Sequence, residues 1–279
     1  MTRNPDAPAV GRRAQALLDR PEGHALFLDI DGTLLEMAPT PDMVQVPPAL
    51  PALLGELVVR LDGAVALLTG RRIASADCLL QPLRLIASGV HGTELRSEPG
   101  GEIAMLAPPI PPAMAAAVAA LGGRAEGILV ERKGAGIAVH YRHAPHARDR
   151  LVTELRAIVA TDAGFVLREG RMVLEIGPGG FSKGSALALL HARPPFAGRR
   201  PVMIGDDVGD ESALREAERR GGVALRVAGE HFSAANADFA GVDAVRAFLT
   251  TFAARPSASP MTRGARGEWR RAPAGGRER

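Results

Sequence analysis

Short apolar runs alternate with amphipathic segments along most of this chain. The apolar runs predict buried strands at residues 24–28, 64–68, 85–88, 201–204 and 222–225. Apolar residues at helical spacing predict helices at about residues 48–61 and 211–219. Strands that alternate with helices are typical of an α/β fold with a parallel sheet.

The middle of the chain has a different order of elements. Prolines between residues 108 and 112 predict a stiff linker, and the Gly-rich segment at 177–180 predicts a second joint. Between the two joints the pattern predicts a helix and two strands, twice over, which indicates a smaller α/β cap domain inserted into the larger one. The expected divisions are an N-terminal extension (1–23), the core (24–107 and 181–252), the cap (108–180) and a disordered basic tail (253–279).

The net charge is distributed unevenly along the chain. The sequence pI is 9.7, but residues 253–279 carry seven Arg and two Glu, and the rest of the chain is slightly acidic. Aromatic residues make up only 4% of the chain, so few are available to stack on bases. We therefore expect no nucleic-acid partner, despite the high pI.

The chain contains one cysteine and no segment typical of a membrane protein. Cys78 cannot form an intramolecular disulfide, and its apolar neighbours favour a place in the core. The first twenty residues lack the apolar block of a signal peptide, and the longest apolar stretch, near 113–121, is too short to span a bilayer. We expect a cytoplasmic monomer with no membrane partner.

Two aspartates directly follow the first predicted strand. Asp29 and Asp31 lie in the segment DIDGTL, where Gly32 permits a sharp turn. A carboxylate nucleophile at Asp29 would divide phosphate-ester hydrolysis into two displacements, and the carboxyl of Asp31 could protonate the leaving oxygen. An Asx turn is the alternative for the pair alone, but the residues that follow and the segments described next favour catalysis.

Two further segments offer groups that bind phosphate. Thr69, Gly70 and Arg71 follow the strand at 64–68, where a hydroxyl and backbone N–H groups could cradle a phosphate, although simple helix capping is the alternative. Lys183 opens a predicted helix, at a position where the helix dipole favours anions. A lysine there indicates a phosphate or carboxylate in front of it, and a solvated surface lysine is the alternative.

An acidic cluster follows the strand at 201–204. The segment GDDVGDE places four acids within six residues, which repel one another unless a cation is present. Because Mg²⁺ prefers oxygen ligands, we expect Asp29, the carbonyl of Asp31 and Asp206 to hold it. Asp210 could instead cap the next helix. These segments all belong to the edge at which open α/β sheets bind ligands, so we expect them to meet in one crevice.

In this order the four segments resemble the motifs of the haloacid dehalogenase (HAD) superfamily of phosphatases. More narrowly, the chain resembles the bacterial trehalose-6-phosphate phosphatases from about residue 24 to residue 249. The segments GVHGTE (89–94), ERK (131–133), VHYR (139–142) and VLEI (173–176) also resemble that family. The resemblance implies a Rossmann-like HAD core with a closing cap, and Mg²⁺-dependent hydrolysis of the sugar phosphate through an aspartyl phosphate.

The resemblance also implies which residues bind the substrate. They are Thr69, Gly70, Arg71, His91, Gly92, Glu131, Lys133, Arg142 and Glu175. Without the resemblance, a solvated sheet face is the alternative for the charged cap residues, and a core position is the alternative for His91. Gly209 stands where the family usually has Thr, Thr69 where Ser is more frequent, and Gly177 where a basic residue is common, so one substrate contact is missing.

Three other functions compete with this hypothesis. A phosphatase of the same superfamily could act on sucrose phosphate or mannosyl-3-phosphoglycerate instead. A phosphorelay receiver also uses Asp, Mg²⁺, Thr and Lys, but it would place its phospho-acceptor on a later strand in a much shorter chain. A catalytically silent regulatory subunit would not need the full set of catalytic side chains. We therefore favour the trehalose-6-phosphate phosphatase.

Overall fold

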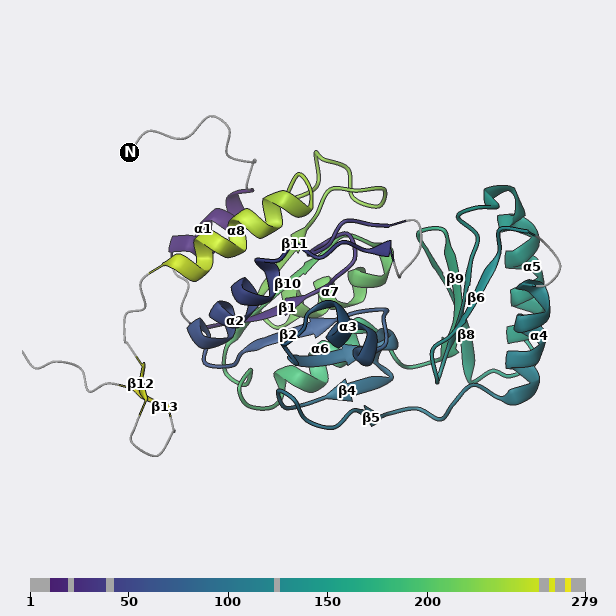
Figure 1. Ribbon diagram of the computed structural model, residues 1–279, viewed down its shortest axis with the longest axis horizontal. Helices are drawn as coiled ribbons and strands as arrows, with labels where there is room; N and C mark the ends of the chain where they lie inside the picture. The colour runs from purple at the N-terminus through teal and green to yellow at the C-terminus, as the bar shows by residue number, and fades with distance from the viewer. Residues whose placement is uncertain are drawn as a thin grey trace, which may run out of the picture.

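Two separate β-sheets organise the molecule. The computed structural model describes residues 11–19, 23–38, 43–122 and 126–255, together with the backbone of 261–263 and 269–271. Within these residues a seven-stranded and a four-stranded sheet lie side by side, each with its own helices (Figure 1). Each sheet also packs on its own cluster of buried apolar side chains. The predicted α/β class with a mostly parallel main sheet is confirmed.

The seven-stranded sheet has the strand order β11-β10-β1-β2-β3-β4-β5. The strands from β11 to β3 pair in parallel, and β4 and β5 extend the edge with antiparallel pairs. Their bounds are His24–Leu28 (β1), Val65–Leu68 (β2), Ile86–Gly89 (β3), Glu94–Arg96 (β4), Ala104–Met105 (β5), Arg200–Gly205 (β10) and Val223–Arg226 (β11). All residues of β1 and β2 are buried, because helices cover a parallel sheet, and this explains the continuous apolar runs in the sequence.

Six of the described helices accompany the main sheet, and five of them form two packed groups. Their bounds are Arg12–Asp19 (α1), Leu50–Arg60 (α2), Ile73–Leu79 (α3), Lys183–His191 (α6), Glu211–Arg219 (α7) and Val242–Ala254 (α8). α1 and α2 pack against α8, whereas α6 packs against α7. The helix predicted at 211–219 is confirmed, but α3 and α8 were not predicted. Cys78 lies exposed on α3, so its predicted core position is wrong.

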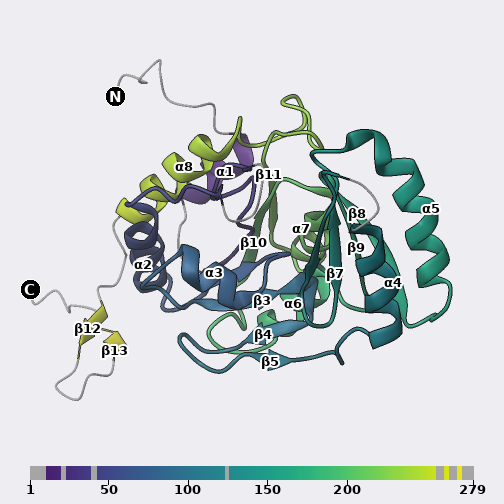
Figure 2. The same cartoon turned by 45° about the vertical axis from the view of Figure 1, so that its right-hand side comes forward.

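The four-stranded sheet has the order β6-β7-β9-β8 and is antiparallel throughout. Its elements are Pro112–Gly122 (α4), Leu129–Arg132 (β6), Ile137–His140 (β7), Arg148–Val159 (α5), Phe165–Gly170 (β8) and Val173–Pro178 (β9). Both helices cover the face of this sheet that points away from the main sheet, as both views show (Figures 1 and 2). The other face is left directed at the main sheet. We propose that this unit, with the predicted bounds 108–180, is the cap.

The ends of the chain are described only in part. The N-terminal extension contributes α1, in which the Arg13 guanidinium donates to Asp238 Oδ1 at 3.1 Å. Of the predicted tail, α8 continues to Ala254, and Met261–Arg263 (β12) pairs antiparallel with Trp269–Arg271 (β13). The rest of the predicted disordered tail lies outside the described residues. Among the helices that are described, none combines the length and the hydropathy that crossing a membrane requires.

Candidate active site

Three neighbouring strands bring the acidic segments together. β10, β1 and β2 are adjacent in the sheet, and their carboxyl ends lead to Asp206, Asp29 and Thr69. Since parallel strands end at the same edge, residues distant in sequence meet there. They lie beside a cavity of about 720 Å³ whose wall comes from both the main sheet and the cap. This volume is large enough for a small-molecule ligand.

Asp29 is held by a buried lysine. Lys183 Nζ, at the first turn of α6, donates to Asp29 Oδ1 at 2.5 Å and to Asp210 Oδ1 at 2.6 Å. Burial would lower the pKa of Lys183, but Asp210 and Asp29 outweigh it and raise that pKa, so the ammonium stays charged. Burial, then Asp210, raise the pKa of Asp29 well above its usual value, and Lys183 opposes this only in part.

Asp206 stands next to Asp29 and is also anchored. Thr33 Oγ1, which is fully buried, donates to Asp206 Oδ1 at 3.1 Å. Burial, then the neighbouring Asp210, raise the pKa of Asp206 to about 7. Asp29, Asp206 and Asp210 therefore repel one another, and Lys183 offsets only part of this repulsion.

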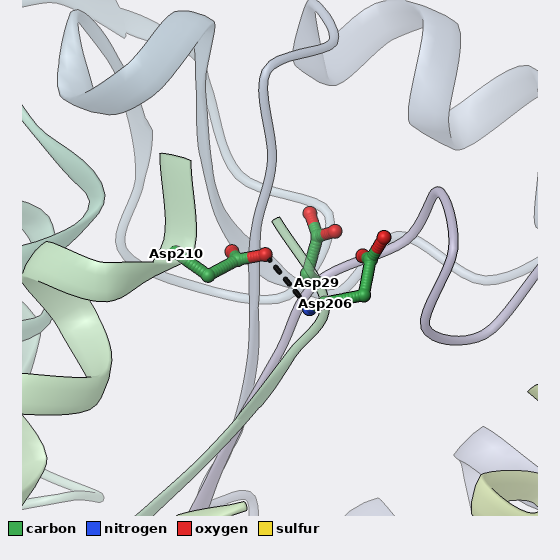
Figure 3. Close-up of side chains that lie close together, drawn as sticks. All are labelled: Asp29, Asp206 and Asp210. Carbon is green, nitrogen blue, oxygen red and sulfur yellow. Dashed lines mark hydrogen bonds between the residues drawn. The ribbon is translucent and has the colours of Figure 1, made fainter. Parts of the chain in front are cut away.

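Asp210 has a different role from the one that the sequence suggested. Its side chain does not cap α7, and its Oδ2 instead accepts from the backbone N–H groups of Asp206 and Asp207 at 3.1 Å each. Figure 3 shows the hydrogen bond from Asp206. With Oδ1 bound to Lys183, both oxygens are engaged, and the residue is 0% exposed. Asp210 thus fixes both the acidic loop and the lysine, and the spacing of the acids alone could not reveal this.

The donor set at this edge fits a hard divalent cation. Carboxylate oxygens of Asp29, Asp206 and Asp210 lie within 4.8 Å of one another. Asp29 and Asp206 line the cavity, whereas Asp210 lies behind them with its oxygens engaged. Oxygen ligands of this kind suit Mg²⁺, which keeps several waters and takes one or two carboxylates. We therefore propose Asp29 and Asp206 as the ligands of such a cation, with Asp210 as their support.

Gly32 is required for this arrangement. It adopts a left-handed backbone with φ of +83°, and a Cβ built on it would lie 2.1 Å from Asp206 Oδ2. Any larger residue must displace the Asp206 carboxylate. We expect Gly32→Ala to lower the apparent affinity for Mg²⁺ by on the order of 10–100-fold, measured by titrating the protein with Mg²⁺.

Gly198→Ala is the matched control for that variant. Gly198 has a similar φ of +78°, but a Cβ there would meet nothing within 4 Å. It carries the same backbone strain without the collision. Equal Mg²⁺ dependence in the two variants would contradict the role assigned to Gly32.

Asp31, the predicted acid, faces a different partner. The guanidinium of Arg71 donates to it through two nitrogens, Nε to Oδ2 at 2.6 Å and Nη2 to Oδ1 at 2.7 Å. Such a bidentate pair fixes the orientation of the carboxyl group. Because the side chain turns to Arg71, Asp31 stays a proposed cation ligand only through its carbonyl. Both residues line the cavity, close to the acidic cluster.

Cap residues reach across to the main sheet. Lys133 Nζ donates to Gly70 O at 3.1 Å and is also hydrogen-bonded to Glu175, which in turn shares a hydrogen bond with His91. Burial would raise the pKa of Glu175, but Lys133 and His91 outweigh it and hold that pKa well below its usual value. Glu131 shares a 2.9 Å hydrogen bond with His140 Nε2. Glu175 is thus held as a carboxylate, and Glu131, Lys133 and Glu175 all line the cavity.

The loop that carries His91 is conformationally strained. Val90 and His91, in the 3₁₀ turn Val90–Gly92 (η2), have positive φ values of 46° and 53°. A β-branched residue rarely adopts this conformation, and such strain accumulates at functional sites. Gly70 leaves room for the ring, because a Cβ on it would lie 2.9 Å from His91 Nε2.

The other predicted substrate residues differ in their access to the cavity. Gly70 and Arg142 line it, but Thr69 and Gly92 are buried and do not. The Thr69 hydroxyl accepts from Arg71 N at 3.1 Å, and a Cβ on Gly92 would lie 2.8 Å from Ser182 O. These two residues support the site from behind its wall. Gly209, which stands where the resemblance implies Thr, has room for a side chain, because a Cβ on it would lie 3.7 Å from His91. The glycine therefore removes no acidic group from the site.

Comparison with known proteins agrees with the class that the fold and site define, the HAD phosphatases. A family model described as trehalose-phosphatase matches residues 27–244. The chain is 43% identical over 205 residues to a probable trehalose-phosphate phosphatase of Sinorhizobium fredii and 38% identical to the trehalose-6-phosphate phosphatase of Escherichia coli; each match covers 73% of this chain and 77% of the relative. The chain belongs to the trehalose-phosphatase family.

A solved structure supports the fold independently. The C-terminal domain of the trehalose-6-phosphate phosphatase of C. albicans superposes with a TM-score of 0.73 at 19% identity, covering 89% of this chain and 99% of that domain. At this identity the likeness concerns the fold alone. It extends over both sheets, because the matched region includes most of the chain.

Proposed function

We propose that this protein hydrolyses trehalose 6-phosphate to trehalose and inorganic phosphate, with Mg²⁺ as its cation. The observation that carries the proposal is the buried pair of Lys183 with Asp29, placed beside Asp206 under a polar cap face. The named relatives at 43% and 38% identity support the choice of substrate. The monomeric state, the cytoplasmic location and the sugar phosphate as sole partner stay predictions.

The first displacement forms the covalent intermediate. A carboxylate oxygen of Asp29 attacks phosphorus, the bond from phosphorus to the sugar oxygen breaks, and that oxygen takes a proton from Asp31. Lys183 offsets negative charge around Asp29 throughout. Mg²⁺ held by Asp29 and Asp206 would neutralise charge on the phosphoryl oxygens.

The second displacement releases phosphate. Asp31, now a carboxylate, takes a proton from a water molecule that attacks phosphorus, and the bond between phosphorus and Asp29 breaks. Phosphate leaves, and both aspartates return to their starting states. Since Arg71 binds both oxygens of Asp31 in the free protein, we propose that the substrate phosphate competes for Arg71 and so frees the Asp31 side chain to reach the leaving oxygen.

The cap selects the sugar. Glu131, Lys133 and Glu175 present fixed donors and acceptors to the cavity, and such groups can hydrogen-bond several hydroxyls. In the free protein they satisfy one another, so a sugar must replace these contacts with equivalent ones. Closure over the substrate excludes bulk water from the phosphoryl transfer.

Phosphate release from a panel of sugar phosphates tests this function. We expect trehalose 6-phosphate to have the highest kcat/KM, above sucrose phosphate, mannosyl-3-phosphoglycerate and glucose 6-phosphate. Because a bound cation contributes several kcal/mol to phosphoryl transfer, EDTA should slow the reaction at least ~100-fold, and added Mg²⁺ should restore it. A higher kcat/KM for another sugar phosphate would contradict the substrate, and full activity in EDTA would contradict the cation.

A further inference from the structure

One face of the cap sheet presents an unassigned arginine to the cavity. Residues opposite one another across the sheet form the row Glu131, Ala138, Glu175 and Arg168, from β6 through β7 and β9 to β8. Residues of one row share a face of the sheet. Glu131, Glu175 and Arg168 all line the cavity, and Ala138 leaves space between the two acids. Arg168 is therefore the last residue of this row, on β8.

The guanidinium of Arg168 is fixed by the joint between cap and core. Its Nη2 donates to Pro178 O at 2.7 Å and to Phe181 O at 2.9 Å. These carbonyls use the hydrogens of Nη2, so the N–H groups of Nη1 and Nε remain for a ligand. Both bonds hold the side chain in one orientation without neutralising its charge.

Arg168 occupies the space beside Gly177. A Cβ built on Gly177 would lie 2.7 Å from Arg168 Nη1, so a side chain at position 177 and this placement of Arg168 exclude each other. The absence of a side chain at Gly177 on β9 thus leaves the space that the guanidinium of Arg168 occupies.

Arg168 is poorly compensated in this position. The nearby acid, Glu175, is already bound to Lys133 and His91. Burial lowers the pKa of Arg168, and Glu175 opposes this only in part. A partly desolvated guanidinium without its own carboxylate gains from a ligand that offers oxygen atoms.

We propose that Arg168 is a specificity-determining residue that donates hydrogen bonds to sugar hydroxyls next to Glu175. The proposal rests on the proposed function, since it assigns a contact to the same substrate. The small substrate p-nitrophenyl phosphate has no sugar to reach Arg168. The side chain therefore affects sugar phosphates selectively.

Variants at the two positions test the proposal. A lost hydrogen bond to a charged group should raise KM for trehalose 6-phosphate about tenfold in Arg168→Gln, with kcat and the hydrolysis of p-nitrophenyl phosphate changed by less than about twofold. Gly177→Lys alone should raise KM because it collides with Arg168. Adding Gly177→Lys to Arg168→Gln should restore much of the affinity. Arg150→Gln, an exposed arginine of α5 paired with Glu154, is the matched control and should leave both substrates unchanged.

The possible outcomes separate this role from others. An unchanged KM in Arg168→Gln would overturn the proposal. An equal loss of activity with both substrates, together with a lower melting temperature, would also overturn it. Arg168 would then only stabilise the connection between the cap and the main sheet. If the wild type prefers another sugar phosphate, the proposed function fails, but the same KM comparison with that substrate still decides the role of Arg168.

Discussion

Asp29→Asn should lower kcat for trehalose 6-phosphate by about 10⁴-fold or more while the protein stays folded, since removing a nucleophile has effects of this order. The amide oxygen of asparagine cannot form the acyl phosphate. The fold should tolerate the change, because it removes one of three mutually repelling carboxylates and leaves Lys183 paired with Asp210. Steady-state phosphate release and thermal unfolding measure the two parts of this expectation.

Asp243→Asn is a suitable control for the charge change alone. Asp243 is exposed on α8, where it pairs with Arg246, far along the chain from the acidic cluster. We expect its activity to equal that of the wild type. Turnover by Asp29→Asn above about 1% of the control would argue against Asp29 as the nucleophile.

Asp31→Asn should separate substrates by the basicity of their leaving group. General acid catalysis contributes typically 10²–10⁴-fold, so formation of the aspartyl phosphate from trehalose 6-phosphate should slow about 10³-fold. The nitrophenolate ion leaves without protonation, so the same step with p-nitrophenyl phosphate should slow less than about tenfold. Asparagine can still accept a hydrogen bond from Arg71, which keeps the site in shape.

Pre-steady-state kinetics isolate the step in question. Because Asp31 also activates the water, the second displacement slows for both substrates in this variant. We expect a burst of nitrophenol followed by slow turnover, and no burst of trehalose. Equal slowing of the two first steps would contradict the acid role of Asp31.

The strands and the segments that follow them were predictable because a strand buried on both faces is a continuous apolar run in the sequence. β1 and β2 are covered on both faces and read as apolar runs, and an acid at the end of such a run must lie at the sheet edge. Asp29 and Asp206 were placed at the sheet edge in this way, whereas Lys183 was singled out because a lysine at the start of a helix opposes the usual dipole preference. Cys78 was misplaced because a short helix on the surface carries apolar residues on one side only.

Contacts between residues that are distant in sequence could not be predicted from such local patterns. Asp210 looked like a helix cap in sequence, and only the position of Lys183, twenty-seven residues earlier, gives it a different partner. The bidentate pair of Asp31 and Arg71 spans forty residues for the same reason. Arg168 was not recognised because the local pattern shows neither its hydrogen bonds to the carbonyls of Pro178 and Phe181 nor its place at the cavity.

The central claim is that Asp29 carries the phosphoryl group during turnover. Acid quenching of the wild-type protein during hydrolysis of trehalose 6-phosphate, followed by mass mapping of its peptides, tests this directly. Fragmentation distinguishes Asp29 from Asp31 within one peptide. We expect an acid-stable acyl phosphate on Asp29 that is absent from Asp29→Asn. A phosphoryl group on a different residue of the wild type would contradict the account. So would the absence of any phosphoryl group from Asp31→Asn when it is quenched after its burst of nitrophenol.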